Sequence, residues 1–174
     1  MGQSPVLRSS LCNGWRIGVE PMKRSPRLYK LVLGTAFLLN MVAVTVSFPP
    51  MMEGLMSVGW ILFGIGALLY ILSAITLRRR DERHVVESGV YGLVRHPLYL
   101  GAMMMFCSHI FLGQNGLVVV GTLVAVVCCY LLMLADEQQN VEAFGDDYTQ
   151  YMQRVPRMNL LSGLLRRRRR TKQG

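Results

Sequence analysis

Charged side chains are scarce in this sequence. Asp, Glu, Lys and Arg make up only 17% of its 174 residues, whereas hydrophobic residues make up 52%. If a chain of this length and composition were water-soluble, it would carry more apolar side chains than its interior could bury. The shortage of charge therefore argues against a soluble domain and indicates that much of the chain lies in a lipid bilayer.

Acidic residues are the rarer charged class, with ten Asp and Glu against 19 Lys and Arg and a net charge of +9. The basic residues are dispersed beside apolar segments, without the interleaved aromatic side chains typical of a nucleic-acid surface. We therefore expect no nucleic-acid partner. Membrane topology and contacts with anionic lipid headgroups explain the charge.

Cysteine occurs only four times. Cys107, Cys128 and Cys129 lie within apolar stretches and Cys12 lies near the N-terminus. This pattern offers neither a disulfide framework nor a C-x-x-C metal pair, so we expect no metal site.

The long apolar runs define the fold class. A helix rises ~1.5 Å per residue and needs ~20 apolar residues to cross ~30 Å of hydrocarbon. The runs close to this length are residues 28–48, 54–77, 97–112 and 117–135. The sequence thus predicts an all-α integral-membrane bundle of about four transmembrane helices, of which the third is the shortest.

The segments between the runs predict the orientation. Basic residues gather at 22–30, 78–84 and 166–170, whereas 49–54 and 113–116 contain neither Lys nor Arg. By the positive-inside rule, both termini and the central loop face the cytoplasm. We therefore expect a multi-pass protein, located in the inner or plasma membrane if the source is bacterial.

Four regions follow from this pattern. We expect a disordered cytoplasmic segment at 1–27, a two-helix membrane hairpin at 28–77, a core at 78–160 and a basic cytoplasmic tail at 161–174. Met22, followed by Lys23 and Arg24, would be a more natural start than Met1.

Two features of the membrane segments have structural interpretations. Gly59, Gly64 and Gly66 would let a neighbouring helix approach closely; they follow no strand, so they do not form a nucleotide-binding loop.

His109 lies near the outer end of its helix, where an interfacial hydrogen bond would satisfy it. Because His96 is ~20 Å away along one helix, the two histidines are not expected to bind a haem together.

The stretch at 95–101 is the first candidate functional element. Pro97 is suited to the first turn of a helix, where no partner exists for its missing N–H. Arg95 and His96 then lie at the positive end of the helix dipole and would form an anion site with the free backbone N–H groups. Tyr99, one turn further on, either anchors the helix at the interface or lines the same site.

A second polar cluster follows the fourth apolar run. The residues that recur there at steps of three and four are Glu137, Val141, Phe144, Tyr148, Tyr151 and Val155. This spacing predicts an amphipathic cytoplasmic helix at the membrane surface, provided that Gly145 does not break it. The short loop at 113–116 requires an antiparallel hairpin, which should return Asp136 and Glu137 to the neighbourhood of Arg95 and His96.

The motifs at these two places occur in a definite order. They are Gly89-Val90-Tyr91, Arg95-His96-Pro97-x-Tyr99-x-Gly101, Asp136-Glu137, and Phe144-Gly145-x-x-Tyr148-x-x-Tyr151-x-x-x-Val155-Pro156-Arg157.

With these motifs the chain resembles, over residues 86–157, the integral-membrane methyltransferases related to isoprenylcysteine carboxyl methyltransferase and to phospholipid N-methyltransferases. The resemblance implies a cytoplasm-facing pocket for S-adenosylmethionine and methyl transfer to a lipophilic acceptor. One departure is Asp136, where these enzymes usually have Glu; the shorter side chain changes what it can reach.

The resemblance also implies a set of site residues. The residues expected to bind the cofactor are Tyr91, Arg95, His96, Pro97, Tyr99, Gly101, Asp136, Glu137, Tyr148 and Tyr151. The candidate catalytic residues are Glu137, Arg154 and Arg157. In this scheme Arg95 and His96 hold an anionic group, and Glu137 takes a cation or orients the acceptor. An amine acceptor would need Glu137 or His96 as a base.

Several alternatives stay open. Arg154 and Arg157 would either clamp an acidic acceptor or bind lipid phosphates. The acceptor could be an isoprenylcysteine-type carboxylate, a phospholipid amine or a similar molecule. The C-terminal pattern also resembles NADPH-dependent membrane sterol and enone reductases, although those chains are usually longer. A non-enzymatic basic membrane scaffold is the third possibility, and the oligomeric state is undetermined.

Overall fold

The computed structural model describes residues 26–46, 52–79 and 85–160. Within these ranges every regular element is a helix: α1 (Pro26–Val46), α2 (Glu53–Arg78), the short 3₁₀ helix η3 (Gly89–Gly92), α3 (Pro97–Gly113), α4 (Gly116–Phe144) and α5 (Asp146–Arg154). The predicted all-α class is confirmed for the described part of the chain. Residues 1–25 of the expected N-terminal segment, the basic tail at 161–174 and the choice between Met1 and Met22 lie outside the described residues.

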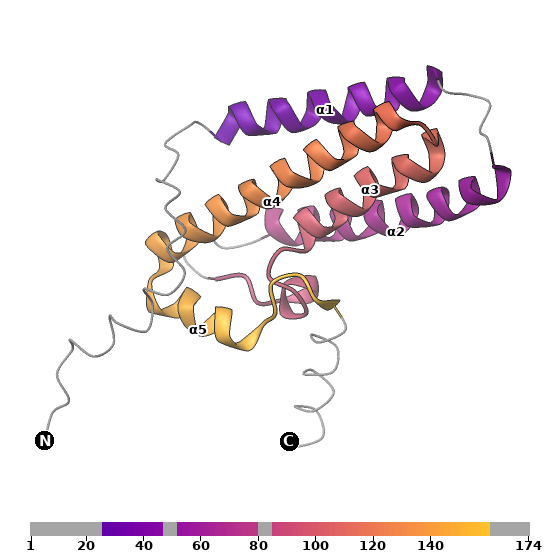
Figure 1. The fold of residues 1–174 in the computed structure, drawn as a ribbon. Coiled ribbons are helices and arrows are strands. Elements are labelled where there is room, and N and C mark those ends of the chain that lie inside the picture. The colour runs from indigo at the N-terminus through magenta and orange to yellow at the C-terminus, as the bar shows by residue number, and fades with distance from the viewer. Residues whose placement is uncertain (1–25, 47–51, 80–84, 161–174) are drawn as a thin grey trace, which may run out of the picture.

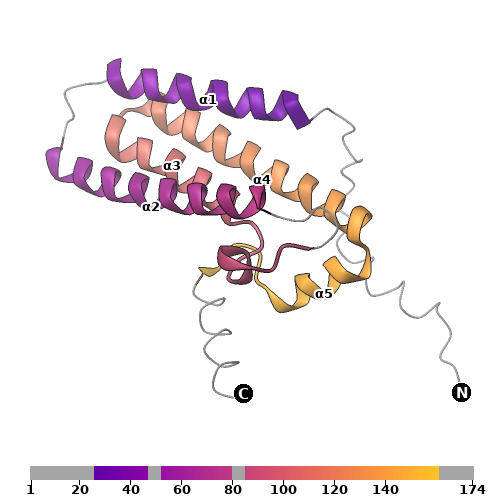
Figure 2. The same ribbon diagram turned by 180° about the vertical axis from the view of Figure 1, so that it is seen from behind.

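The long helices pack in an order that differs from their order in the sequence. Figures 1 and 2 show α1 on one side of the bundle and α2 on the other, with α4 and α3 between them. The main partner of α2 is α3, whereas α1 packs on α4 and α3. Helices α1 and α2, expected as one membrane hairpin at 28–77, make their principal contacts with the later helices.

The turn between α3 and α4 is closed by polar side chains. Gln114 adopts a left-handed backbone conformation, with φ 46°, and its side chain exchanges two hydrogen bonds of 2.8 Å with the backbone of Met52. Asn115 caps α4 by accepting a hydrogen bond from the Val118 N–H at 2.9 Å. These contacts produce the tight antiparallel hairpin that the short loop predicted.

The largest difference from the sequence expectation lies at Gly145. Helix α4 continues through Asp136 to Phe144, and Gly145, with φ 54° and ψ −122°, ends it before α5 begins. Only glycine adopts this backbone conformation readily. The condition attached to the expected amphipathic helix is therefore not met: Gly145 breaks it, its first part extends α4 and its second part forms α5. Val141, expected on the same face as Tyr148 and Tyr151, is 37% exposed.

His109 is also placed differently from the expectation. Its side chain is fully buried between the rings of Phe37, Phe63 and Phe106, and its Nε2 lies 3.1 Å from the Met41 Sδ. The predicted interfacial hydrogen bond is wrong, because α1 and α2 cover this face of α3.

Glycine sets the closeness of α2 and α3. A Cβ atom on Gly101 would lie 2.7 Å from the Gly66 carbonyl oxygen and 2.8 Å from the Tyr70 backbone nitrogen. Gly59 lies similarly against Leu112 of α3, whereas a Cβ on Gly64 would meet nothing within 4 Å. Gly59 and Gly66 thus lie in the predicted close contact between helices, whereas Gly64 faces away from it.

Two of the described helices are long and apolar enough to cross a membrane, α2 with 26 residues and α4 with 29. The apolar part of α1, Leu31–Val46, and α3 are shorter.

The Gly101→Ala variant tests the α2–α3 contact. Because the added methyl group meets backbone atoms that cannot rotate away, we expect the free energy of unfolding in mild detergent to fall by about 1–3 kcal/mol. A denaturant titration followed by circular dichroism measures it. Gly64→Ala is the matched control: it adds the same methyl group in open space and should not destabilise. Equal stability of Gly101→Ala and wild type would contradict this packing.

Candidate functional site

The segments that flank α3 and α5 are joined by backbone hydrogen bonds. The Arg95 N–H donates to the Pro156 carbonyl at 3.0 Å, and the His96 N–H donates to the Arg157 carbonyl at 3.3 Å. The Tyr151 hydroxyl donates to the Tyr91 carbonyl at 2.7 Å, in the buried interior. Chain segments about sixty residues apart in the sequence therefore form one unit beside the start of α3.

Glu137 is the electrostatic centre of this unit. Its Oε1 pairs with the Arg95 Nη1, its Oε2 lies 2.7 Å from the Arg157 Nη2, and the His96 Nε2 lies 3.8 Å from Oε1. The residue is only 5% exposed. Burying a carboxylate is costly unless its charge is paired and hydrogen-bonded, and here two guanidinium groups provide this compensation.

Several donors in the cluster have no acceptor within the described ranges. The Arg95 Nε, the His96 Nε2 and the Arg157 Nε are buried and make no hydrogen bond to the described residues. The helix α3 begins directly after His96, with Pro97 in its first turn as predicted. Its first N–H groups have no partner inside the helix, and the positive end of its dipole faces the same region.

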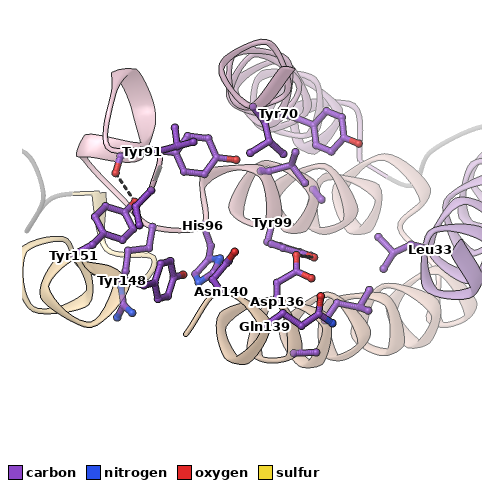
Figure 3. Close-up of a pocket in the computed structure, with 18 of the residues that line it drawn as sticks. Leu33, Tyr70, Tyr91, His96, Tyr99, Asp136, Gln139, Asn140, Tyr148 and Tyr151 are labelled. Atoms are coloured by element: carbon purple, nitrogen blue, oxygen red, sulfur yellow. Dashed lines mark hydrogen bonds between the residues drawn. The ribbon is translucent and has the colours of Figure 1, made fainter. Parts of the chain in front are cut away.

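A cavity of about 840 Å³ lies between these segments and the four long helices. This volume falls within the ~300–1,000 Å³ usual for small-molecule sites. In Figure 3, Tyr148 and Tyr151 lie at one end of the cavity, Tyr99 and Asp136 at its middle, and Leu33 of α1 at the opposite end. The cavity is therefore polar and aromatic at one end and apolar at the other.

Asp136 and Tyr99 meet across the middle of the cavity. The Tyr99 hydroxyl donates a hydrogen bond of 2.5 Å to the Asp136 Oδ2. The aspartate is thus long enough to reach α3, and the pair connects α4 to α3 one turn beyond the Glu137 cluster.

The two tyrosines of α5 cover the polar end. Their rings are 5.6 Å apart, and both residues are almost fully buried. Burial is the main cause that raises the pKa of Tyr151, and the neighbouring Tyr148 raises it further. Burial is also the main cause that raises the pKa of Tyr148, with the charge of Glu137 adding to it. Both phenols therefore stay protonated at neutral pH and can donate hydrogen bonds.

The structure brings most of the predicted site residues together. Those that line the cavity are Tyr91, Arg95, His96, Tyr99, Asp136, Tyr148 and Tyr151. Glu137 and Arg157 do not line it: Glu137 pairs with the lining residue Arg95 and with Arg157, and Pro97 opens α3 without lining the cavity.

Two predicted site residues lie elsewhere. Gly101 faces the backbone of α2 rather than the cavity, so its position is explained by helix packing. The Arg154 Nη2 lies 2.7 Å from the Glu87 Oε1, and both side chains are about half exposed. This ion pair fastens α5 to the segment before η3.

Other lining residues were not predicted. Gln139 and Asn140 follow the acidic pair on α4, and Leu33 and Phe37 come from α1. The amides could have been found from their position within one turn of Asp136. In α1 the signal for the packed face is Asn40, a polar side chain that is buried against Gly121 of α4, but it does not identify Leu33 and Phe37 as lining residues.

In the described part of the chain, no group of three or more His, Cys, Asp or Glu side chains is placed to hold a metal ion. No protein-family model matches the chain, and no curated protein is significantly similar to it. The geometry of the cavity is therefore the main guide to function.

Replacing Glu137 with Gln tests the ion-pair cluster. Because this change leaves the largely buried Arg95 guanidinium, and the partly exposed one of Arg157, without their carboxylate, we expect the free energy of unfolding to fall by about 3 kcal/mol. Denaturant titration in detergent measures the change. The control is Glu142→Gln, which removes the same charge from an exposed position of the same helix and should alter stability by less than about 0.5 kcal/mol. Similar stability of both variants would show that the cluster does not stabilise the fold.

Proposed function

We propose that this protein is an integral-membrane S-adenosylmethionine-dependent methyltransferase that acts on a lipophilic acceptor at the cytoplasmic face of the membrane. The observation that carries the proposal is the cavity itself. Its polar end is lined by Arg95, His96 and Asp136, and it continues into an apolar end between the helices. These features suit a polar, partly anionic cofactor placed beside an apolar acceptor.

The exposed surface supports a membrane location. Large apolar side chains are exposed along α1, α2 and α4, including Leu38 at 66%, Ile61 at 65% and Leu117 at 74%. In water such extended apolar faces are unfavourable, whereas lipid accommodates them. In this proposal α1 to α4 all span the bilayer, and the distribution of basic residues places the Glu137 cluster on the cytoplasmic side.

The donors and acceptors around the cavity match the groups of S-adenosylmethionine. Its carboxylate is suited to the Arg95 guanidinium and to the free N–H groups at the N-terminus of α3. Asp136 is placed to attract a cationic group, and the rings of Tyr148 and Tyr151 offer aromatic faces to a sulfonium or an adenine. When bound, the cofactor would supply an electrophilic methyl group for transfer to the acceptor.

The residues of the site would act mainly by positioning. Holding two reactants in the correct geometry can supply ~7–11 kcal/mol of the barrier reduction. A carboxylate or thiolate acceptor would need no base. An amine acceptor would need to lose a proton, and His96 is better placed than Glu137 to accept it, since His96 lines the cavity and Glu137 is held by two guanidinium groups.

The Arg95→Lys variant tests cofactor binding. Lysine keeps the positive charge beside Glu137 but lacks the Nε donor and the planar guanidinium. We expect calorimetric titration of the purified protein to show saturable S-adenosylmethionine binding that weakens about tenfold in this variant, equivalent to ~1.4 kcal/mol. Glu142→Gln is the control and should bind as the wild type does.

The same titration with NADPH separates the alternatives. If the protein binds NADPH and does not bind S-adenosylmethionine, the methyltransferase proposal is contradicted and a membrane reductase is favoured. Binding of neither molecule, by protein whose circular dichroism shows intact helices, would favour a non-enzymatic scaffold.

A further inference from the structure

The apolar end of the cavity lies between α1, α3 and α4, with Tyr70 of α2 beside it. Leu33, Phe37, Ala102, Phe106 and Leu132 are among its lining side chains. Figure 3 shows Leu33 on the far side of the Tyr99–Asp136 pair from Tyr148. A molecule that fills the cavity therefore passes from a mainly polar end to a mainly apolar end.

Two phenylalanine rings close this apolar end. Phe37 of α1 and Phe106 of α3 pack edge to face, with ring centroids 5.7 Å apart and planes at 80°. Phe106 is 2% exposed. We call this pair the floor of the cavity.

The layer behind the floor is filled. His109 is completely buried, its ring centroid lies 5.3 Å from that of Phe37 and 6.2 Å from that of Phe106, and Phe63 packs on its other side at 6.2 Å. Neither His109 nor Phe63 lines the cavity. The space accordingly ends at the floor and does not continue along α3.

The position of the floor along α3 limits the length of an occupant. Phe106 comes ten residues after His96, which corresponds to about 15 Å along a helix. Half of a typical hydrocarbon core is also about 15 Å. If α3 begins at the cytoplasmic interface, the floor lies near the middle of the bilayer.

We propose that the Phe37–Phe106 floor determines the specificity of the site by selecting a single-chain amphiphile of limited length. Its polar head lies near His96 and Asp136, and its apolar chain ends against the two rings. The identification of this amphiphile as the methyl acceptor rests on the function proposed above, whereas the length limit is a property of the cavity. A volume of about 840 Å³ that also holds a cofactor leaves room for one chain rather than several.

The test uses n-alkylamines from hexyl to hexadecyl as probes. Their binding constants for the detergent-solubilised protein are calculated from the free concentration of each amine. Each methylene that enters the cavity should tighten binding about fourfold. In the wild-type protein this gain should stop once the chain reaches the floor. In Phe106→Ala it should continue for longer chains, because the ring that blocks them is gone.

Two further variants complete the design. Phe63→Ala removes an aromatic ring from the layer behind the floor and should keep the wild-type limit. Ala102→Leu fills the cavity one helical turn before Phe106 and should shorten the limit, so the floor can be tested even if Phe106→Ala does not fold. An unchanged limit in folded Phe106→Ala, or in Ala102→Leu, would overturn the floor.

Titration of S-adenosylmethionine on the same samples distinguishes the two proposals. Binding of S-adenosylmethionine with no chain-length limit would overturn the floor and leave the methyltransferase proposal intact. A limit that shifts in Phe106→Ala, in protein that does not bind S-adenosylmethionine, would support the floor and contradict the methyltransferase proposal.

Discussion

The buried carboxylate of Glu137 is the interaction on which the polar half of this molecule depends. It comes from α4, and its guanidinium partners come from the residue before His96 and from the segment after α5. Three separate stretches of chain must converge to compensate one charge, and a mismatch at any of them would leave a charged group buried without a partner. The backbone hydrogen bonds from Arg95 and His96 to residues 156 and 157 follow the same convergence. The cavity exists beside this cluster because the cluster fixes the distance between α3, α4 and α5.

A second constraint sets the apolar half. Gly66 and Gly101 allow the backbones of α2 and α3 to touch. Asn115 caps α4 at the tight turn after α3, and Gln114 ties this turn to Met52 at the start of α2. Helix α1 then covers the remaining side through Phe37, which reaches Phe106. Close packing on one side of α3 and a looser contact on the other leave space between α1, α3 and α4. The same helix thus provides the N-terminus that we propose binds an anion, the Tyr99 hydroxyl and one ring of the proposed floor.

Much of this arrangement could be predicted from the sequence, because it depends on local signals. Pro97 set the start of α3, the apolar runs set α2 and α3 to within a few residues, and the short loop required the hairpin that brings Glu137 to Arg95. The break at Gly145 could not be decided from periodicity, which fitted one long helix as well as two. The partners of α1 were equally hidden: Asn40 marks the face that packs, but nothing in the sequence says which helix lies against it. Gly101 shows a further limit: it belongs to a motif that suggests ligand binding, yet its contacts are with the α2 backbone.

In the proposed function, the cavity beside Glu137 holds S-adenosylmethionine. Ultraviolet cross-linking of the radiolabelled cofactor to the protein in lipid nanodiscs, followed by mapping of the labelled peptides, tests this directly. We expect label in the peptides that contain Tyr91 to Tyr99 or Asp136 to Tyr151, and its loss when excess unlabelled cofactor is added. Label confined to other segments, or label that excess cofactor does not displace, would contradict it.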